Sequence, residues 1–200
     1  MTAVLAPTRP VLADRLGRTR TIDATLVIGG ALFVALCSQV QVPLGFTPVP
    51  INGLTFASMV VGGALGLRRG TTAMGLFWLA GLAGLPFYAG GEHGWSVASG
   101  ATGGYLIGAI AAAMLMGAIA ERGGDRRIRS SVPAMILANA VLIYVPGTLW
   151  LAHVVSAPVF GGSQSAFALG VAPFIVGDAL KLVLAGLVLP VAWRFLGQRG

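Results

Sequence analysis

The chain has 200 residues, of which 56% are hydrophobic and only 10% are charged, and its mean hydropathy is +0.86. Soluble domains carry about 25% charged residues, so this composition excludes an ordinary soluble protein and favours a membrane protein. The net charge of +7 comes from short basic clusters between apolar runs, without an aromatic ladder or recognition module, which argues against a nucleic-acid partner.

The first 21 residues are polar and basic and include Pro7 and Pro10. Their longest apolar run is too short for a signal-peptide core, and no small-residue cleavage site follows. We therefore predict that residues 1–21 form a flexible cytoplasmic tail and that residues 22–200 form one membrane domain.

Six membrane-spanning helices are predicted in that domain, because a helix needs about 20 apolar residues to cross a bilayer. Several are short or interrupted by glycine, so tilts and breaks are expected. The fold class is all-α. The approximate bounds of the six spans are 24–42, 51–67, 72–87, 103–120, 132–153 and 172–193.

The arginines test this count. All twelve lie in the tail, between spans two and three, between spans four and five, or after span six. Because basic residues accumulate in cytoplasmic loops, this pattern predicts that both termini are cytoplasmic. Five or seven spans would place an arginine cluster outside.

The outer connections, residues 42–53, 86–104 and 156–165, are rich in glycine, proline or aromatic residues. Irregular backbone near a membrane is buried in protein or lines a wet cavity, which predicts an outward-facing binding site.

The stretch "FIVGDALKLVL" in span six contains Asp178 and Lys181, the only lysine in the chain. Residues three apart share a helix face, and that face must point inward because a charge exposed to lipid is costly. Two interpretations are a salt bridge that locks the bundle and a ligand site. The outward-facing loops favour the ligand site. The pair would suit a small molecule that carries an acid or an amide.

Other side chains could complete this site, although each has an ordinary structural role as an alternative. Asn52 could cap a helix, Trp95 could anchor the chain at the membrane interface, and Phe87 could face lipid. Asn139, in span five, is expected to form an interhelical hydrogen bond. The candidates beside Asp178 and Lys181 are Tyr105, Asn52, Trp95, Phe87 and Thr102.

No catalytic, metal or cofactor site is predicted. The chain has no P-loop motif, its single cysteine excludes an intrachain disulfide, and His93 and His153 lack zinc-site spacing. A serine–glycine turn of the rhomboid protease type is also absent. An intramembrane enzyme is therefore disfavoured, although only a product assay would exclude one.

Three pairs of small residues are spaced four apart, which allows another helix to approach closely. From the pattern alone, packing within the same chain is the favoured role. The pairs are Ala31 and Ala35, Gly62 and Gly66, and Gly104 and Gly108.

Four motifs then occur in order: "TPVPINGLTFASMVVGGALGLRRG", "GLAGLPFYAGG", "GATGGYLIG" and "PFIVGDALKLVLAGLVLP". Together they resemble the signatures of BioY, the biotin-binding S component of energy-coupling factor (ECF) transporters. The resemblance spans residues 46–190. It implies a six-helix S-component fold in the cell membrane, with biotin bound near the outer face and no enzymatic activity of its own.

The resemblance also implies partners and roles. Such subunits work with a transmembrane T component and two cytoplasmic ATPases. Ala31 and Ala35 match the family's Ala-x-x-x-Ala motif, which contacts the T component. Asp178, Lys181 and Tyr105 match its ligand-binding positions, but whether Lys181 contacts the biotin carboxylate or the ureido carbonyl stays open.

The chain departs from the family pattern at three positions, since Asn52, Leu54 and Ala101 replace the usual Thr, Gln and Pro. These departures affect the details of the pocket. The alternatives to an ECF subunit for biotin are a self-sufficient secondary biotin carrier and an S component for another small vitamin.

Overall fold

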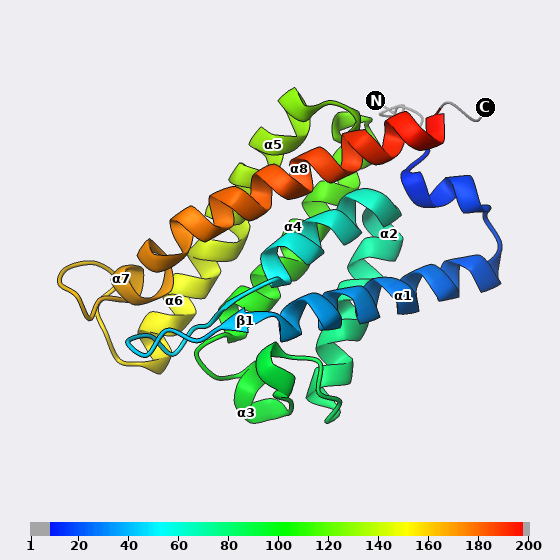
Figure 1. Cartoon of the computed structure of the whole chain (residues 1–200). Helices are drawn as coiled ribbons and strands as arrows, with labels where there is room; N and C mark the ends of the chain where they lie inside the picture. The colour runs from blue at the N-terminus through cyan, green and yellow to red at the C-terminus, as the bar shows by residue number, and fades with distance from the viewer. Residues whose placement is uncertain (1–8, 198–200) are drawn as a thin grey trace, which may run out of the picture.

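The computed structural model describes residues 9–197 and is almost entirely helical (Figure 1). The structure confirms an all-α chain, and four of its helical segments are long and apolar enough to cross a membrane. In chain order the elements are η1 (Leu12–Leu16), α1 (Arg20–Gln39), β1 (Gln41–Val42), β2 (Ile51–Asn52), α2 (Leu54–Leu82), η2 (Ala89–Gly91), α3 (Trp95–Ala98), α4 (Gly103–Ala120), η3 (Gly124–Arg126), α5 (Ile128–Leu137), η4 (Ala138–Ile143), α6 (Tyr144–Val154), α7 (Ala166–Gly170), η5 (Ala172–Phe174) and α8 (Ile175–Gly197).

Predicted spans two and three together form α2, which is interrupted at Gly66. This residue has φ of 85°, a left-handed conformation that breaks the helix and that glycine adopts without steric cost. The two segments lie close together on either side of the break. A Cβ added to Gly70, in the second segment, would lie 2.9 Å from the Cα of Gly62, in the first. The Glu121 carboxylate accepts a hydrogen bond of 3.0 Å from the backbone N–H of Leu67, the first residue after the break. Six helices therefore result, as predicted.

The other four predicted spans are continuous or nearly so. Span one is α1. Span four has the predicted bounds, Gly103–Ala120. Span five is α5, η4 and α6 in succession, and span six is α7, η5 and α8. The remaining polar segments gather at the two ends of this bundle.

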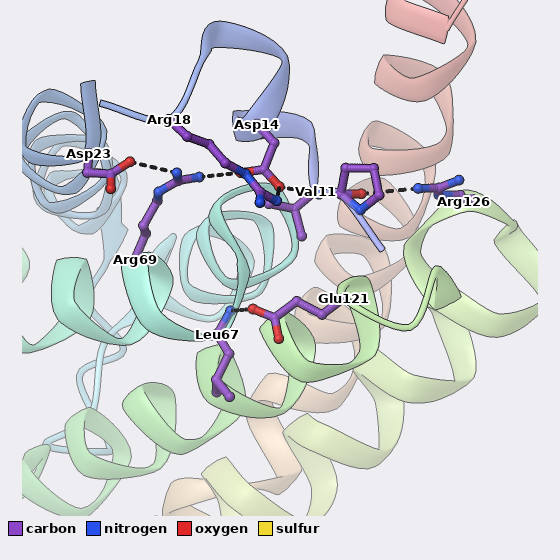
Figure 2. A network of polar contacts seen from close by, with 9 residues as sticks. Val11, Asp14, Arg18, Asp23, Leu67, Arg69, Glu121 and Arg126 are labelled. Carbon is purple, nitrogen blue, oxygen red and sulfur yellow. Dashed lines mark hydrogen bonds and ion pairs between the residues drawn. The ribbon is translucent and has the colours of Figure 1, made fainter. Parts of the chain in front are cut away.

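One end, the arginine end, holds η1, the Gly66 break and η3, and the described chain both begins and finishes there (Figure 1). Asp14 accepts hydrogen bonds from Arg18 and Arg69, and Arg69 also pairs with Asp23 at 2.6 Å (Figure 2). Burial raises the pKa of the Asp14 carboxyl, but its hydrogen bonds from Arg18, the Val11 N–H and Arg69 outweigh burial and lower it to about 2. The clusters predicted to share one side of the membrane thus share one end of the fold. Arg199 lies outside the described residues.

Part of the predicted tail packs against the bundle. Val11, Leu12 and Ala13 are buried, and Val11 and Ala13 pack with Ala120 at the end of α4. These apolar side chains are buried, whereas charged side chains of the same segment form ion pairs. Residues 1–8 lie outside the described residues.

The opposite end, the loop end, carries connections that side chains tie to the helices. Strands β1 and β2 pair antiparallel, with Gln41 opposite Asn52. The Gln39 side chain lies within 3.1–3.4 Å of the carbonyl oxygens of residues 86–88, which holds that segment against the end of α1. The Thr47 hydroxyl donates to the Leu169 carbonyl at 2.7 Å, joining the β1–β2 loop to α7.

The glycine pairs pack within the chain, as the pattern favoured. A Cβ on Gly62 would overlap the carbonyl oxygen of Ala113 in α4. Gly104 and Gly108 likewise face the backbone of Pro146 and Leu142. These positions allow α4 to contact both α2 and the fifth span at backbone distance.

Ala31 and Ala35 do not form the open contact face expected for a partner helix. Their side chains are only 1% and 6% exposed, and they belong to the core between α1 and its neighbours. The adjacent Gly30 is equally close to α2, since its Cβ would lie 2.9 Å from Leu65 and 3.1 Å from Ala73. The contact of these two side chains with a T component therefore stays a prediction, and in this conformation both are buried within the chain.

Candidate binding cavity

A cavity of about 440 Å³ opens between the helices at the loop end, a volume typical of small-molecule sites. The β1–β2 loop, residues 88–102, α4, the fifth span and the start of span six all line it. Two of the three glycine- and proline-rich connections thus enclose a cavity, as predicted. The third, residues 156–165, contributes nothing to its lining.

Asp178 and Lys181 lie at the inner polar part of this cavity, in the first two turns of α8. Their side chains share one face and pair at 2.8 Å, as the spacing predicted. The side chains are 6% and 19% exposed, so both charges are turned into the bundle. The inward placement follows from the cost of exposing either charge to lipid.

The other oxygen of Asp178 is held by the fifth span. The Tyr144 hydroxyl donates to Oδ2 at 2.8 Å, and the Asn139 amide donates to the same oxygen at 3.3 Å. The interhelical hydrogen bond predicted for Asn139 is therefore confirmed. Tyr144 was missed, because a tyrosine five residues after Asn139 would face away from it in an α-helix.

The π-helical segment η4 explains why these two residues converge. In an α-helix, residues five apart point about 140° away from each other. A π-helical turn closes at i to i+5, so Asn139 and Tyr144 come to lie on nearly the same face. Local π-geometry therefore aims both donors at one carboxylate oxygen.

Tyr105 lines the cavity and is fixed by backbone rather than by other side chains. It is 8% exposed, and its hydroxyl donates to the Gly170 carbonyl at 2.9 Å. Its ring lies against Gly147, where a Cβ would collide with it. Thr102 also lines the cavity, at the N-terminus of α4. The structure thus brings these two predicted residues together with the acid–base pair.

Asn52 lies beside the N-terminus of α2 and at the cavity. Its side-chain oxygen accepts a hydrogen bond of 3.0 Å from the Leu54 N–H at the start of α2, and the residue also lines the cavity. The hydrogen bond occupies one acceptor position of the amide oxygen. The amide nitrogen, with two donors, and one acceptor position on the oxygen stay available to a ligand.

Trp95 and Phe87 do not line the cavity, so nothing in its geometry supports their predicted role. Trp95 is 68% exposed at the start of α3. Phe87 stacks on Phe77 with ring centroids 6.3 Å apart and packs against the core. Both lie next to lining residues in the chain, but the irregular backbone between Pro86 and Gly100 turns their side chains elsewhere.

Hydrogen-bonding capacity indicates what this site can bind. A carboxylate offers about four acceptor positions and an ammonium three donors. Asp178 uses three of its positions and Lys181 uses one of its donors within the site. What stays available is one acceptor position and two donors, adjacent to each other. This arrangement suits a ligand that presents an N–H beside a carbonyl or carboxylate oxygen.

Comparisons with known proteins agree with one another. The model of the BioY family matches residues 9–198. A protein named biotin transporter BioY from Rhizobium etli is 34% identical, over 85% of this chain and 91% of the relative. One of the same name from Rhodobacter capsulatus is 38% identical, over 83% and 90%. A crystal structure of the S component for biotin from an ECF-type ABC transporter superposes with a TM-score of 0.78. It is 24% identical and covers 89% of this chain and 95% of its own.

Proposed function

The chain belongs to the BioY family, and from this premise we propose that it is the biotin-binding S component of an ECF-type transporter. It is a multi-pass membrane protein with a helical fold shared with a solved S component. The observation that carries the proposal is the cavity at the loop end with Asp178 and Lys181 at its polar part.

Biotin matches the hydrogen-bonding capacity of that site. Its ureido group places an N–H next to a carbonyl oxygen, and the rest of the molecule is an apolar bicycle and chain that ends in a carboxylate. The one acceptor position left on Asp178 would take the ureido N–H, and Lys181 would donate to the neighbouring carbonyl oxygen. In this assignment the planar ureido group bonds to both Asp178 and Lys181. This favours the ureido carbonyl over the carboxylate as the partner of Lys181.

The distribution of arginines supports an orientation. All the described arginines lie at or near the end opposite the cavity, and basic residues favour the cytoplasmic side. We therefore assign the arginine end and both termini to the cytoplasm and the cavity to the outer side. Biotin would enter through the loops and be delivered inward.

Delivery requires energy that the chain does not supply by itself, because its sequence has no P-loop. A T component and two cytoplasmic ATPases would provide it. Since Ala31 and Ala35 are buried against α2, an Ala31→Trp variant would disturb helix packing and could not report on coupling alone. If this pair contacts the T component, α1 must first move away from α2.

Binding of a panel of vitamins tests the substrate. The purified chain is heated with each vitamin in turn, and biotin alone is expected to raise its midpoint of unfolding, since a ligand that binds only the folded state stabilises it. A larger shift with another vitamin would assign the chain to a different substrate.

Uptake of labelled biotin separates an ECF subunit from a self-sufficient carrier. In a host without any T component or ECF ATPases, the chain is expected to give no uptake above an empty-vector control. Uptake should appear when those subunits are supplied. Full uptake in their absence would instead support the secondary carrier.

Tyr144→Phe is expected to weaken biotin binding by about 5- to 10-fold. The change removes one donor to a buried carboxylate and leaves the ring in place, and losing such a bond costs about 1–1.5 kcal/mol. Titration calorimetry measures it. Tyr88→Phe is the matched control, since its hydroxyl bonds the Trp78 carbonyl away from Asp178. Equal affinities for wild type and Tyr144→Phe would contradict a role for Tyr144 in the site.

A further inference from the structure

A second cavity, the arginine groove, lies at the arginine end between the start of α5 and the end of α8. It measures about 420 Å³ and is lined by Arg126, Arg127, Ile128, Arg129, Pro190 and Arg194. No acidic residue is among them. Four arginines that line one hollow concentrate positive charge there, and like charges repel each other unless an anion lies between them. We propose that the arginine groove binds the phosphate headgroup of an anionic lipid.

The charges that face the groove are not neutralised by the surrounding protein. In residues 9–197, Arg127, Arg129 and Arg194 form no ion pair, and all three are exposed. The nearest acid, Asp125, is fully buried and accepts a hydrogen bond from the Trp193 indole. Burial raises the pKa of its carboxyl, which works against a compensating negative charge.

One wall of the groove is held in place before any ligand arrives. The Arg126 guanidinium lies 4.4 Å from the centre of the Trp193 ring. It also donates a hydrogen bond of 3.1 Å to the Pro10 carbonyl, which links it to the N-terminal segment (Figure 2). Stacking on indole and a backbone acceptor fix its orientation. A fixed guanidinium loses less entropy when it binds an anion than a mobile one does.

The first turn of α5 adds donors to the same place. The helix begins at Ile128 and has ten residues. The N–H groups of Ser130 and Ser131 bond the Arg127 carbonyl, which leaves those of Ile128 and Arg129 as donors, and the positive end of the helix dipole lies at the groove. Arginine forks and helix N-termini both bind phosphate oxygens. Together they favour phosphate over a carboxylate or chloride.

The surroundings favour a lipid as the source of that phosphate. In the two turns before Arg194, α8 exposes Leu187, Val188 and Val191, and Ile128 and Pro190 place apolar surface in the groove itself. Helices α5 and α8 lie side by side there, close enough that a Cβ on Gly186 would meet Val132 (Figure 1). Acyl chains would follow this apolar surface while the headgroup meets the arginines. Basic pockets between helices at the cytoplasmic side are known lipid headgroup sites.

The experiment measures lipid binding to the purified full-length chain by native mass spectrometry. The probes are phosphatidylglycerol, phosphatidylcholine with the same acyl chains, and inorganic phosphate. The groove variant is Arg127→Gln, Arg129→Gln, Arg194→Gln. The control is Arg20→Gln, Arg68→Gln, Arg122→Gln, which removes the same charge from exposed arginines of the same end that do not line the groove.

The wild type is expected to bind one phosphatidylglycerol at least about 10-fold more tightly than phosphatidylcholine. The groove variant should lose about 10-fold or more, and the control should stay within about 2-fold of wild type. Arg194→Gln alone should lose about 3- to 5-fold, which keeps the test valid if the triple variant does not fold. This result is independent of which vitamin the other cavity binds.

Two outcomes would overturn the inference. Equal losses in the groove and control variants would show that the lipid follows overall charge rather than this groove. Binding of inorganic phosphate that depends on the groove, with no preference for phosphatidylglycerol over phosphatidylcholine, would assign the groove to a soluble anion and reject the lipid.

Discussion

Asp178→Asn and Lys181→Met are each expected to raise the Kd for biotin by about 5- to 150-fold. The two side chains pair at 2.8 Å and are only 6% and 19% exposed, so water cannot readily solvate the charge that is left when its partner is removed. Removing either partner leaves the other with unmet hydrogen bonds, worth about 1–3 kcal/mol or more. Titration calorimetry with the purified chain measures both variants.

A double variant separates a ligand site from a structural salt bridge. Because the two residues act on one ligand group, Asp178→Asn with Lys181→Met should lose less than the sum of the single losses. Glu92→Gln is the matched control, since it also lines the cavity but is exposed and outside this network. Variants that lower the midpoint of unfolding yet bind biotin as wild type does would show that the pair only locks the bundle.

Gly62→Ala is expected to lower the midpoint of thermal unfolding by several degrees. The added Cβ would overlap the backbone carbonyl of Ala113, and backbone cannot rotate aside as a side chain can. Overpacking of this kind costs about 1–3 kcal/mol. The crossing of α2 and α4 would have to widen, which would also loosen the turn at Gly66.

Gly75→Ala is the matched control in the same helix. No atom lies within 4 Å of its added Cβ, and alanine is favoured over glycine in a helix by about 0.5–1 kcal/mol. This variant should therefore be as stable as wild type or slightly more so. A Gly62→Ala variant that also matches wild type would show that α2 and α4 are not in close backbone contact.

The polar site shows where sequence reasoning succeeded and where it did not. Asp178 and Lys181 could be paired from their spacing, because three residues along a helix fix a common face. Tyr144 could not be placed beside them, because an ordinary α-helix would direct it away from the Asn139 face. Only the π-helical segment brings it there.

Loop residues were the least predictable part of the site. Thr102 and Tyr105, at the N-terminus of a regular helix, line the cavity, whereas Trp95 and Phe87 do not. Between Pro86 and Gly100 the chain contains several glycines with positive φ, among them Gly90, Gly91 and Gly94. Each such residue redirects the backbone, so neighbours in sequence no longer share a direction.

The sequence by itself determined the class of protein, the six helices, the grouping of arginines at one end and the inward acid–base pair. These follow from hydrophobicity, charge and helical period, which act over a few residues at a time. The tertiary structure alone decided that Ala31 and Ala35 are buried, that Val11 and Ala13 pack with Ala120 of α4, and that four arginines line one groove. These features depend on which segments meet across the bundle. The periodicity of one segment does not specify which other segment packs against it.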